Sequence, residues 1–339
     1  MRDFFTRQDD ARRRSARLIV LFALAVAGVA LAVYGVAAFI RFWFFNREGT
    51  AAALWHPELF LWTAAGTVTF VAAASWWKIS ELRSGGTVVA MTLGAEPVPL
   101  DPDDPGQRQL RNVVEEMAIA SGLPVPDLFI LERERGINAL AAGHGSDDAV
   151  ICVTRGALQL LSRDELQGVI AHEFSHILNG DMRLNLHLLG WLNGILVVSQ
   201  AGEIILRSAG RGSSRGAGPL LLVAAALYVI GYVGYFFGQL IKCAVSRQRE
   251  YLGDAAAVQF TRNPGGLAGA LKKIGGLEAG SRLTHPRAAE VSHMFFGSAM
   301  EDAWLHALDT HPPLKERISL LDPRFDGRFP RVEPLPPPP

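Results

Sequence analysis

The stretch SRDELQGVIAHEFSHILNGDM, residues 162–182, decides the fold of this 339-residue chain. Ser162 is a suitable N-cap, and Glu165 stands three residues later as its capping-box partner, so a helix is expected to begin here. Because 3.6 residues make one turn, His172 and His176 lie on the same face of that helix. The apolar residues that continue the helical spacing are Leu166, Val169, Ile170, Phe174 and Ile177.

Two imidazoles that converge from one helix face are typical zinc ligands. Glu173 follows the first histidine and is expected to lie beside the ligand pair, where it acts as general base on a metal-bound water. The alternative is an amphipathic helix whose histidines are satisfied by hydrogen bonds. Apart from His172, Glu173 and His176, nearly all positions from 166 to 180 hold uncharged residues. Burying these three side chains without a metal would therefore be costly. The sequence therefore predicts one zinc ion per chain.

A catalytic zinc site uses three protein ligands and leaves one position for water, so a third ligand is required. The best candidate is Glu250, in a second expected helix with the sequence SRQREYLGDAAAVQFT. Asp254 lies four residues later on the same face and is expected to hold a ligand histidine by its other ring nitrogen. The alternative is a solvated face on which Arg247 and Arg249 pair with the two acids. Asp181 is a weaker candidate for a supporting role, because Gly-Asp at a helix end is often only capping.

These residues carry a family resemblance. HEFSH, the distal REYLGD, THPPLKERIS at 310–319 and INALAAG at 137–143 resemble the HtpX-type membrane zinc metalloproteases, relatives of the CAAX prenyl protease. The likeness covers most of the chain from about residue 18 to residue 325. It implies an ATP-independent endopeptidase with a mainly helical, zincin-like (gluzincin) α+β domain, a small β-sheet and transmembrane helical hairpins. It also implies zinc on His172, His176 and Glu250, with Glu173 as base.

The resemblance also assigns residues around the substrate. In the family, the segment matching 138–143 is an edge strand beside the cleft, so Asn138 and Ala139 are expected to bind an extended substrate through main-chain hydrogen bonds. Without the resemblance, Asn138 is equally well a turn residue at a strand start. His311 is expected to polarise the scissile carbonyl or to bind the oxyanion. Arg317 is expected to line the same site, with pairing to His311 or to a nearby acid as the alternative.

The composition indicates a membrane protein, with 49% apolar residues, 19% charged residues and a mean hydropathy of +0.19. Residues 18–40 carry no charge and follow a basic segment, and residues 59–77 form a second apolar run. A cleavable signal peptide is the alternative for the first run, but its apolar core exceeds the usual length of about 7 to 15 residues. The basic segment is expected to stay cytoplasmic, so two crossings return the chain to the cytoplasm.

Two further apolar runs, 184–206 and 220–241, separate the second expected ligand from the third. Because Glu250 must share a compartment with His176, both runs cross the membrane or neither does. The arginines between the runs favour a cytoplasmic connection, so a hairpin that is embedded without fully spanning stays open as an alternative.

The expected division of the chain follows from these runs: a basic segment and transmembrane hairpin (1–83), the first part of the protease domain (84–183), a second hydrophobic hairpin (184–241), the second part of the protease domain (242–325) and a Pro-rich tail (326–339). Strands are expected at 127–131, 138–142 and 149–154, with a short run at 88–92 as a further strand candidate. The tail is expected to be extended and disordered.

The sequence therefore predicts an integral-membrane zinc endopeptidase that hydrolyses peptide bonds by zinc-activated water. By resemblance, it is a multi-pass protein of the cell (inner) membrane that faces the cytoplasm with its active site and degrades unfolded or damaged membrane proteins in quality control and the stress response. The alternatives are a prenyl-protein (CAAX) type protease and a non-catalytic zinc-binding scaffold; an intact Glu173 disfavours the scaffold. The formal net charge of +0 gives no indication of a nucleic-acid partner.

Overall fold

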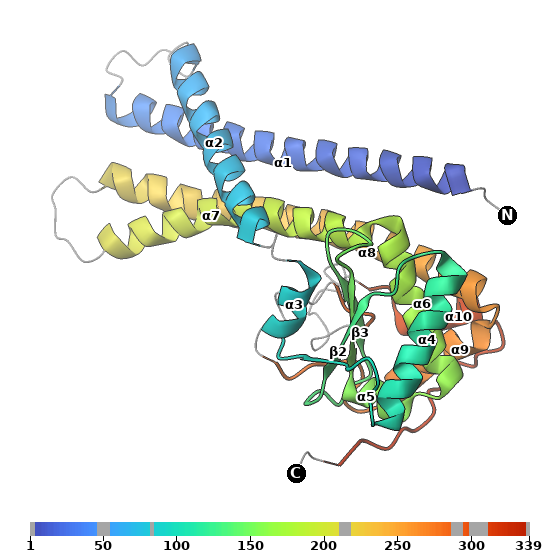
Figure 1. Cartoon of the computed structure of the whole chain (residues 1–339). Helices are drawn as coiled ribbons and strands as arrows, with labels where there is room; N and C mark the ends of the chain where they lie inside the picture. Colours follow the sequence, from blue (N-terminus) through green and yellow to red (C-terminus); the bar gives the residue numbers. More distant parts are fainter. Residues whose placement is uncertain are drawn as a thin grey trace. The chain divides into compact units, whose positions relative to one another are not determined.

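The computed structural model describes residues 4–45, 55–81, 85–209, 218–285, 294–297 and 311–336 (Figure 1). The chain forms two compact units, one from residues 1–82 and 186–242 and the other from residues 83–185 and 243–339. The described residues are mostly helical and also contain one small sheet, so the predicted α+β class is confirmed.

Long helices build the first unit, and each holds one of the apolar runs found in the sequence. They are α1 (Phe4–Phe45), α2 (Pro57–Glu81), α7 (Asp181–Ala209) and α8 (Gly218–Thr261), the last two continuing into the second unit. Each of the four is long and apolar enough to cross a membrane. Small residues allow close approach within this unit: a Cβ added to Gly231 of α8 would meet the Cα of Ser199 in α7 at 2.7 Å.

A mixed four-stranded sheet forms the centre of the second unit. The strand order is β1-β2-β4-β3, with β2 and β4 parallel and the other pairs antiparallel. The strands are β1 (Glu96–Pro97), β2 (Asp127–Leu131), β3 (Ala139–Ala142) and β4 (Val150–Thr154). Strand β3 stands at an edge of the sheet, as predicted for residues 138–142, because only β4 pairs with it along its length.

Helices cover both faces of this sheet (Figure 1). One face packs against α4 (Pro105–Ser121), α6 (Arg163–Asn179) and α9 (Pro264–Gly276), and the other packs against α3 (Gly86–Thr92). The short helices α5 (Arg155–Leu160) and α10 (Leu314–Leu321) complete the described elements. Both faces are therefore buried along β2, β3 and β4, which explains why these three strands are almost continuously apolar, whereas the short β1 at the edge is exposed.

Helix α3 corrects the strand expected at 88–92. Ala90 and Leu93 are buried against the sheet, and a helix brings residues three apart onto one face. The tail also differs from expectation in its described part, residues 326–336. Phe329 and Val332 pack against the core, and the Val332 amide donates to the Gly276 carbonyl at the end of α9 (3.4 Å). Tertiary contacts therefore decide both segments.

Helix α6 begins as predicted, at a capping box. The Ser162 hydroxyl accepts from the Glu165 amide (3.3 Å), and the Glu165 carboxylate accepts from the Ser162 amide (2.7 Å). The same carboxylate lies 2.6 Å from Lys273 Nζ of α9. Near this ion pair the backbones of α6 and α9 approach closely. A Cβ added to Gly168 would lie only 2.6 Å from the backbone nitrogen of Leu267. The absence of a side chain at Gly168 thus allows α6 to pack this closely on α9.

Substituting Gly168→Ala should lower the free energy of unfolding of the second unit by about 1 to 3 kcal/mol, because the added methyl meets backbone that cannot rotate away. The midpoint of thermal unfolding in detergent measures this change. Gly145→Ala is the control, since an added Cβ there meets an atom only at 4.0 Å. Equal midpoints for the two variants would mean that α6 and α9 do not approach this closely.

Candidate metal centre

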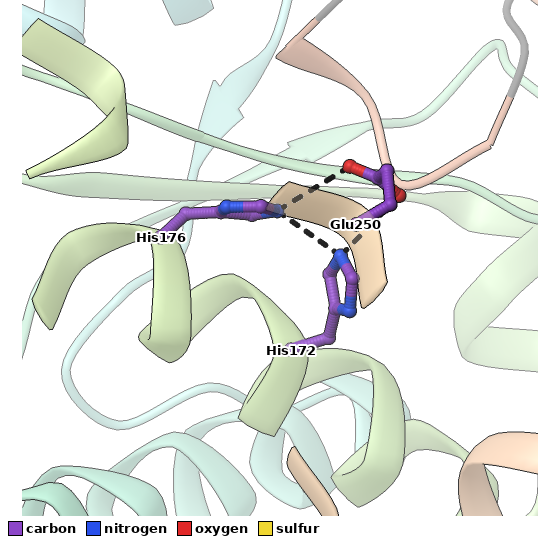
Figure 2. A group of neighbouring side chains, drawn as sticks. All are labelled: His172, His176 and Glu250. Atoms are coloured by element: carbon purple, nitrogen blue, oxygen red, sulfur yellow. Dashed lines mark hydrogen bonds and ion pairs between the residues drawn. The ribbon is translucent and has the colours of Figure 1, made fainter. Parts of the chain in front are cut away.

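Three side chains from two helices point toward one another (Figure 2). His172 and His176 come from adjacent turns of α6, and Glu250 comes from α8. The two Nε2 atoms lie 3.0 Å apart, and each lies 3.6 Å from one carboxylate oxygen of Glu250. Ligand atoms around a tetrahedral zinc with bonds of about 2.1 Å stand about 3.4 Å apart. The spacing of this group therefore fits a metal ion of that size.

The partners of the outer ring nitrogens explain why the inner ones face each other. Asp254 Oδ1 lies 3.0 Å from His172 Nδ1, and Asp181 Oδ2 lies 2.9 Å from His176 Nδ1. A carboxylate beside Nδ1 favours the proton there, so a neutral ring presents a lone pair at Nε2. Two such lone pairs and the Glu250 carboxylate then converge on one point. A cation is the group that satisfies all of them.

The electrostatics of His176 favour a positive charge at the same place. Burial lowers its pKa, but the hydrogen bond and charge of Asp181, with the carboxylates of Glu250 and Glu173, outweigh burial and raise the pKa to about 9. A proton between the two Nε2 atoms would supply this positive charge for His176 alone. A metal ion would supply it for His172, His176 and Glu250 together, with release of the proton.

Glu173 lies beside the ligand pair and is 1% exposed. Neither of its carboxylate oxygens has a hydrogen-bond partner of normal geometry in the described part of the chain, although the backbone amide of Ala141 lies close enough to act on the carboxylate as a donor. Burial raises the pKa of Glu173 to about 7, with His176 opposing the rise and Glu250 adding to it. A buried carboxyl with this pKa can accept and return a proton near neutral pH, which is what a general base requires.

Arg317 does not line a substrate surface as expected. Its side chain is fully buried, and its guanidinium makes a bidentate pair with Asp254 (Nε–Oδ2 2.9 Å and Nη2–Oδ1 2.7 Å). Its Nη1 lies 3.0 Å from Glu250 Oε2 and also donates to the Phe296 carbonyl. Arg317 thus holds Asp254, which in turn faces His172. The expected supporting position of Asp254 is found, and Arg317 stands behind it.

His311 lies within this cluster, with its Nδ1 3.1 Å from Glu250 Oε2. The side chain is 8% exposed, and neither ring nitrogen has a hydrogen bond of normal geometry within the described residues. His311 therefore stands beside the third candidate ligand, with Nδ1 facing the Glu250 carboxylate and Nε2 without a hydrogen bond to the described residues.

Asn138 has a different role from the expected substrate contact. Its side-chain Nδ2 donates to the carbonyls of Ser281 and Gly297, and its Oδ1 accepts from the amides of Ala139 and Gly297. The four hydrogen bonds of the amide group are thereby all made, and the residue is fully buried. Asn138 ties the start of β3 to two distant loop segments.

Ala139 also has no main-chain group left for a substrate. Its amide donates to Asn138, and its carbonyl accepts from the Phe296 amide (2.8 Å). Leu140 and Phe295 form an antiparallel bridge, so the chain itself covers the first half of the β3 edge. Ala141 follows this bridge and lines a small pocket beside the centre, together with Met294 and Phe295.

Phe296 is a site residue that sequence reasoning missed. Its ring lies against the His172 ring, with centroids 5.0 Å apart, and against the Arg317 guanidinium at 5.0 Å. Nothing in the apolar run Met294-Phe-Phe indicates contact with a histidine more than one hundred positions earlier. Gly253 was also unrecognised: a Cβ there would lie 2.7 Å from His172 Cε1. The glycine lets the histidine ring pack directly on α8.

The chain is similar to known proteins over most of its length. The family model described as Peptidase family M48 matches residues 105–324. A "Protease HtpX homolog" of Thermoanaerobacter pseudethanolicus is 35% identical over 268 residues, which cover 77% of this chain and 86% of that protein. A "Protease HtpX homolog" of Caldanaerobacter subterraneus subsp. tengcongensis is 32% identical over 333 residues, covering 94% and 97%. The crystal structure of S. mikatae Ste24p aligns with a TM-score of 0.48 at 19% identity, covering 93% of this chain and 67% of that chain.

Substituting Asn138→Asp should destabilise the second unit by about 2 kcal/mol or more, because a buried carboxylate oxygen would then face the carbonyls of Ser281 and Gly297. Thermal unfolding measures the loss, and Asn112→Asp on exposed α4 surface is the control. Molecules that remain folded should keep an unchanged KM for peptide. A raised KM with unchanged stability would restore Asn138 as a substrate-binding residue.

Proposed function

Because the chain belongs to peptidase family M48, we propose that it is a zinc-dependent endopeptidase of the cell membrane that cleaves unfolded or damaged membrane proteins. The observation that carries this proposal is the convergence of His172 Nε2, His176 Nε2 and the Glu250 carboxylate beside the buried carboxyl of Glu173. A structural zinc site is closed by four protein ligands and needs no base. Three candidate ligands with a base beside them favour catalysis.

The proposed mechanism assigns one task to each residue. When bound to His172, His176 and Glu250, zinc supplies Lewis-acid polarisation and lowers the pKa of a coordinated water to about 7. Glu173 takes a proton from the attacking water and later returns it to the leaving amine, for which its pKa of about 7 is suitable. His311 donates a hydrogen bond to the oxygen that develops negative charge at the scissile carbonyl.

The second unit offers a place for an extended substrate at the outer end of β3. Ala141 follows the bridge between Leu140 and Phe295, and it shares a pocket with Glu250. A substrate strand beside Ala141 would bind through main-chain hydrogen bonds, which accept many side-chain sequences. Such tolerance suits a protease that acts on unfolded chains.

The membrane topology supports a cytoplasmic site. The basic start of the chain is expected to remain in the cytoplasm, and the pair of spanning helices α1 and α2 brings the chain back there. Helices α7 and α8 then form a second hairpin, which keeps His176 and Glu250 in the same compartment. We therefore propose a multi-pass protein of the cell (inner) membrane with a role in quality control under stress.

Substituting Glu173→Gln should lower kcat/KM on an unfolded membrane protein by about 10²- to 10⁴-fold, because the amide cannot take the proton. Zinc content should stay at one ion per chain, as measured by metal analysis of the detergent-purified protein. Removing zinc with a chelator should abolish cleavage by the wild type, and zinc addition should restore it. Glu115→Gln, on an exposed part of α4, is the charge-matched control and should remain active.

The result that separates a protease from a zinc-binding scaffold concerns the wild type. If zinc is bound in both wild type and Glu173→Gln and neither cleaves any unfolded membrane protein, the catalytic proposal fails. Cleavage confined to prenylated C-terminal peptides would instead favour the CAAX type of protease.

A further inference from the structure

Arg249 immediately precedes Glu250 but contacts the opposite side of the candidate metal centre. Its Nη1 lies 2.7 Å from Asp181 Oδ1, while the other oxygen of Asp181 lies 2.9 Å from His176 Nδ1. The Asp181 carboxylate therefore bridges a guanidinium and an imidazole. The three side chains are 11%, 8% and 16% exposed, so solvent screens this chain of contacts weakly.

We propose that Arg249 is a positioning residue for the metal centre, which holds His176 in its ligand orientation through Asp181; this inference rests on the proposed zinc site. Asp181 alone is a short, buried carboxylate at the start of α7. Unpaired, it would carry an uncompensated buried charge and could turn toward water in the adjoining pocket. Arg249 neutralises the carboxylate and occupies one oxygen, which leaves the other for His176.

The other histidine is held in the same way from the opposite side. Arg317 pairs with both oxygens of Asp254, and Asp254 Oδ1 lies 3.0 Å from His172 Nδ1. Each candidate histidine ligand thus has an aspartate behind it and an arginine behind the aspartate. Hydrogen bonds of this kind fix the tautomer and the ring orientation of a metal ligand. The repetition of the pattern indicates that the Arg249 contact belongs to the centre.

The helix geometry explains how α8 serves both histidines. Successive residues on a helix point about 100° apart, so Arg249 and Glu250 leave α8 in different directions. Glu250 and Asp254 lie one turn apart, the first among the ligands and the second at His172. One stretch of α8 therefore supplies a ligand, the support of His172 and the support of Asp181.

The alternative role for Arg249 is direct substrate binding, since the residue also lines the pocket beside Asn185 and Ser246. The two roles predict different measurements. A positioning residue changes the affinity for zinc in the absence of any substrate. A substrate-binding residue changes KM and leaves the affinity for zinc unchanged.

The test uses the full chain purified in detergent, with zinc dissociation constants measured by competition with a chromogenic chelator. Arg249→Gln should weaken zinc binding by about 10- to 100-fold, the range for lost support of a ligand histidine. Arg249→Lys, which keeps the charge, should recover part of the loss. In the background of Asp181→Asn, Arg249→Gln should add little further loss, because the two residues act on His176 as one chain.

Cobalt substitution gives a second readout, since the visible absorption of bound Co²⁺ reports ligand geometry and should differ between wild type and Arg249→Gln. Arg108→Gln, an exposed arginine of α4, is the control and should change neither zinc affinity nor the spectrum. If Arg249→Gln does not fold, Arg249→Met, which also removes the charge and keeps a long side chain, supplies the same comparison.

Unchanged zinc affinity in Arg249→Gln with a raised KM would overturn the inference in favour of substrate binding. Full additivity with Asp181→Asn would also overturn it. Failure of the proposed zinc site is distinguishable, because the wild type itself would then bind no stoichiometric zinc. Failure of the catalytic proposal alone is distinguishable as well, because the wild type would then bind zinc and cleave nothing while the zinc affinities still test Arg249.

Discussion

The structure is organised around lone pairs that meet in a buried space. The Nε2 atoms of His172 and His176 face each other at 3.0 Å because carboxylates stand behind both rings. That arrangement is repulsive without a positive charge between the rings, and the charge must come from a proton or a metal. Behind the two imidazoles stand the negatively charged Asp254 and Asp181, and behind these aspartates stand positively charged arginines. Burial of the two aspartates and the two arginines is tolerable because each of them has a partner of opposite charge.

In the second unit, glycines allow the helix that carries the two histidines to pack closely against its neighbours. Gly168 allows α6 to lie against the backbone of α9, and Gly253 allows the His172 ring to lie against α8. The capping box at Ser162 and the Glu165–Lys273 ion pair fix the beginning of α6. Asn138 fixes β3 from the other side through hydrogen bonds to loop segments. The ligand helix therefore has little freedom to move when a substrate arrives, as preorganised catalysis requires.

Much of the centre could be predicted from sequence because its parts are local. Helical spacing relates His172 to His176 and Glu250 to Asp254, and the capping box announces the start of α6. The roles of Arg317 and Asn138 could not be derived this way, since their partners lie 63 and more than 140 positions away. Periodicity gives the face of a helix on which a side chain stands but not the group it meets there. The strand expected at 88–92 failed for a similar reason, because burial of Ala90 and Leu93 against the sheet selects a helix.

The separation of the candidate ligands along the chain has a consequence for how the protein is made. Glu250 follows His176 by 74 positions (250 − 176), and the intervening residues hold most of α7 and α8. At translation rates of about 5 to 20 residues per second, the histidines emerge about 4 to 15 s before their third partner. During that interval the nascent chain contains the two candidate histidine ligands but not yet Glu250. The metal centre can therefore be completed only after most of α7 and α8 has been synthesised.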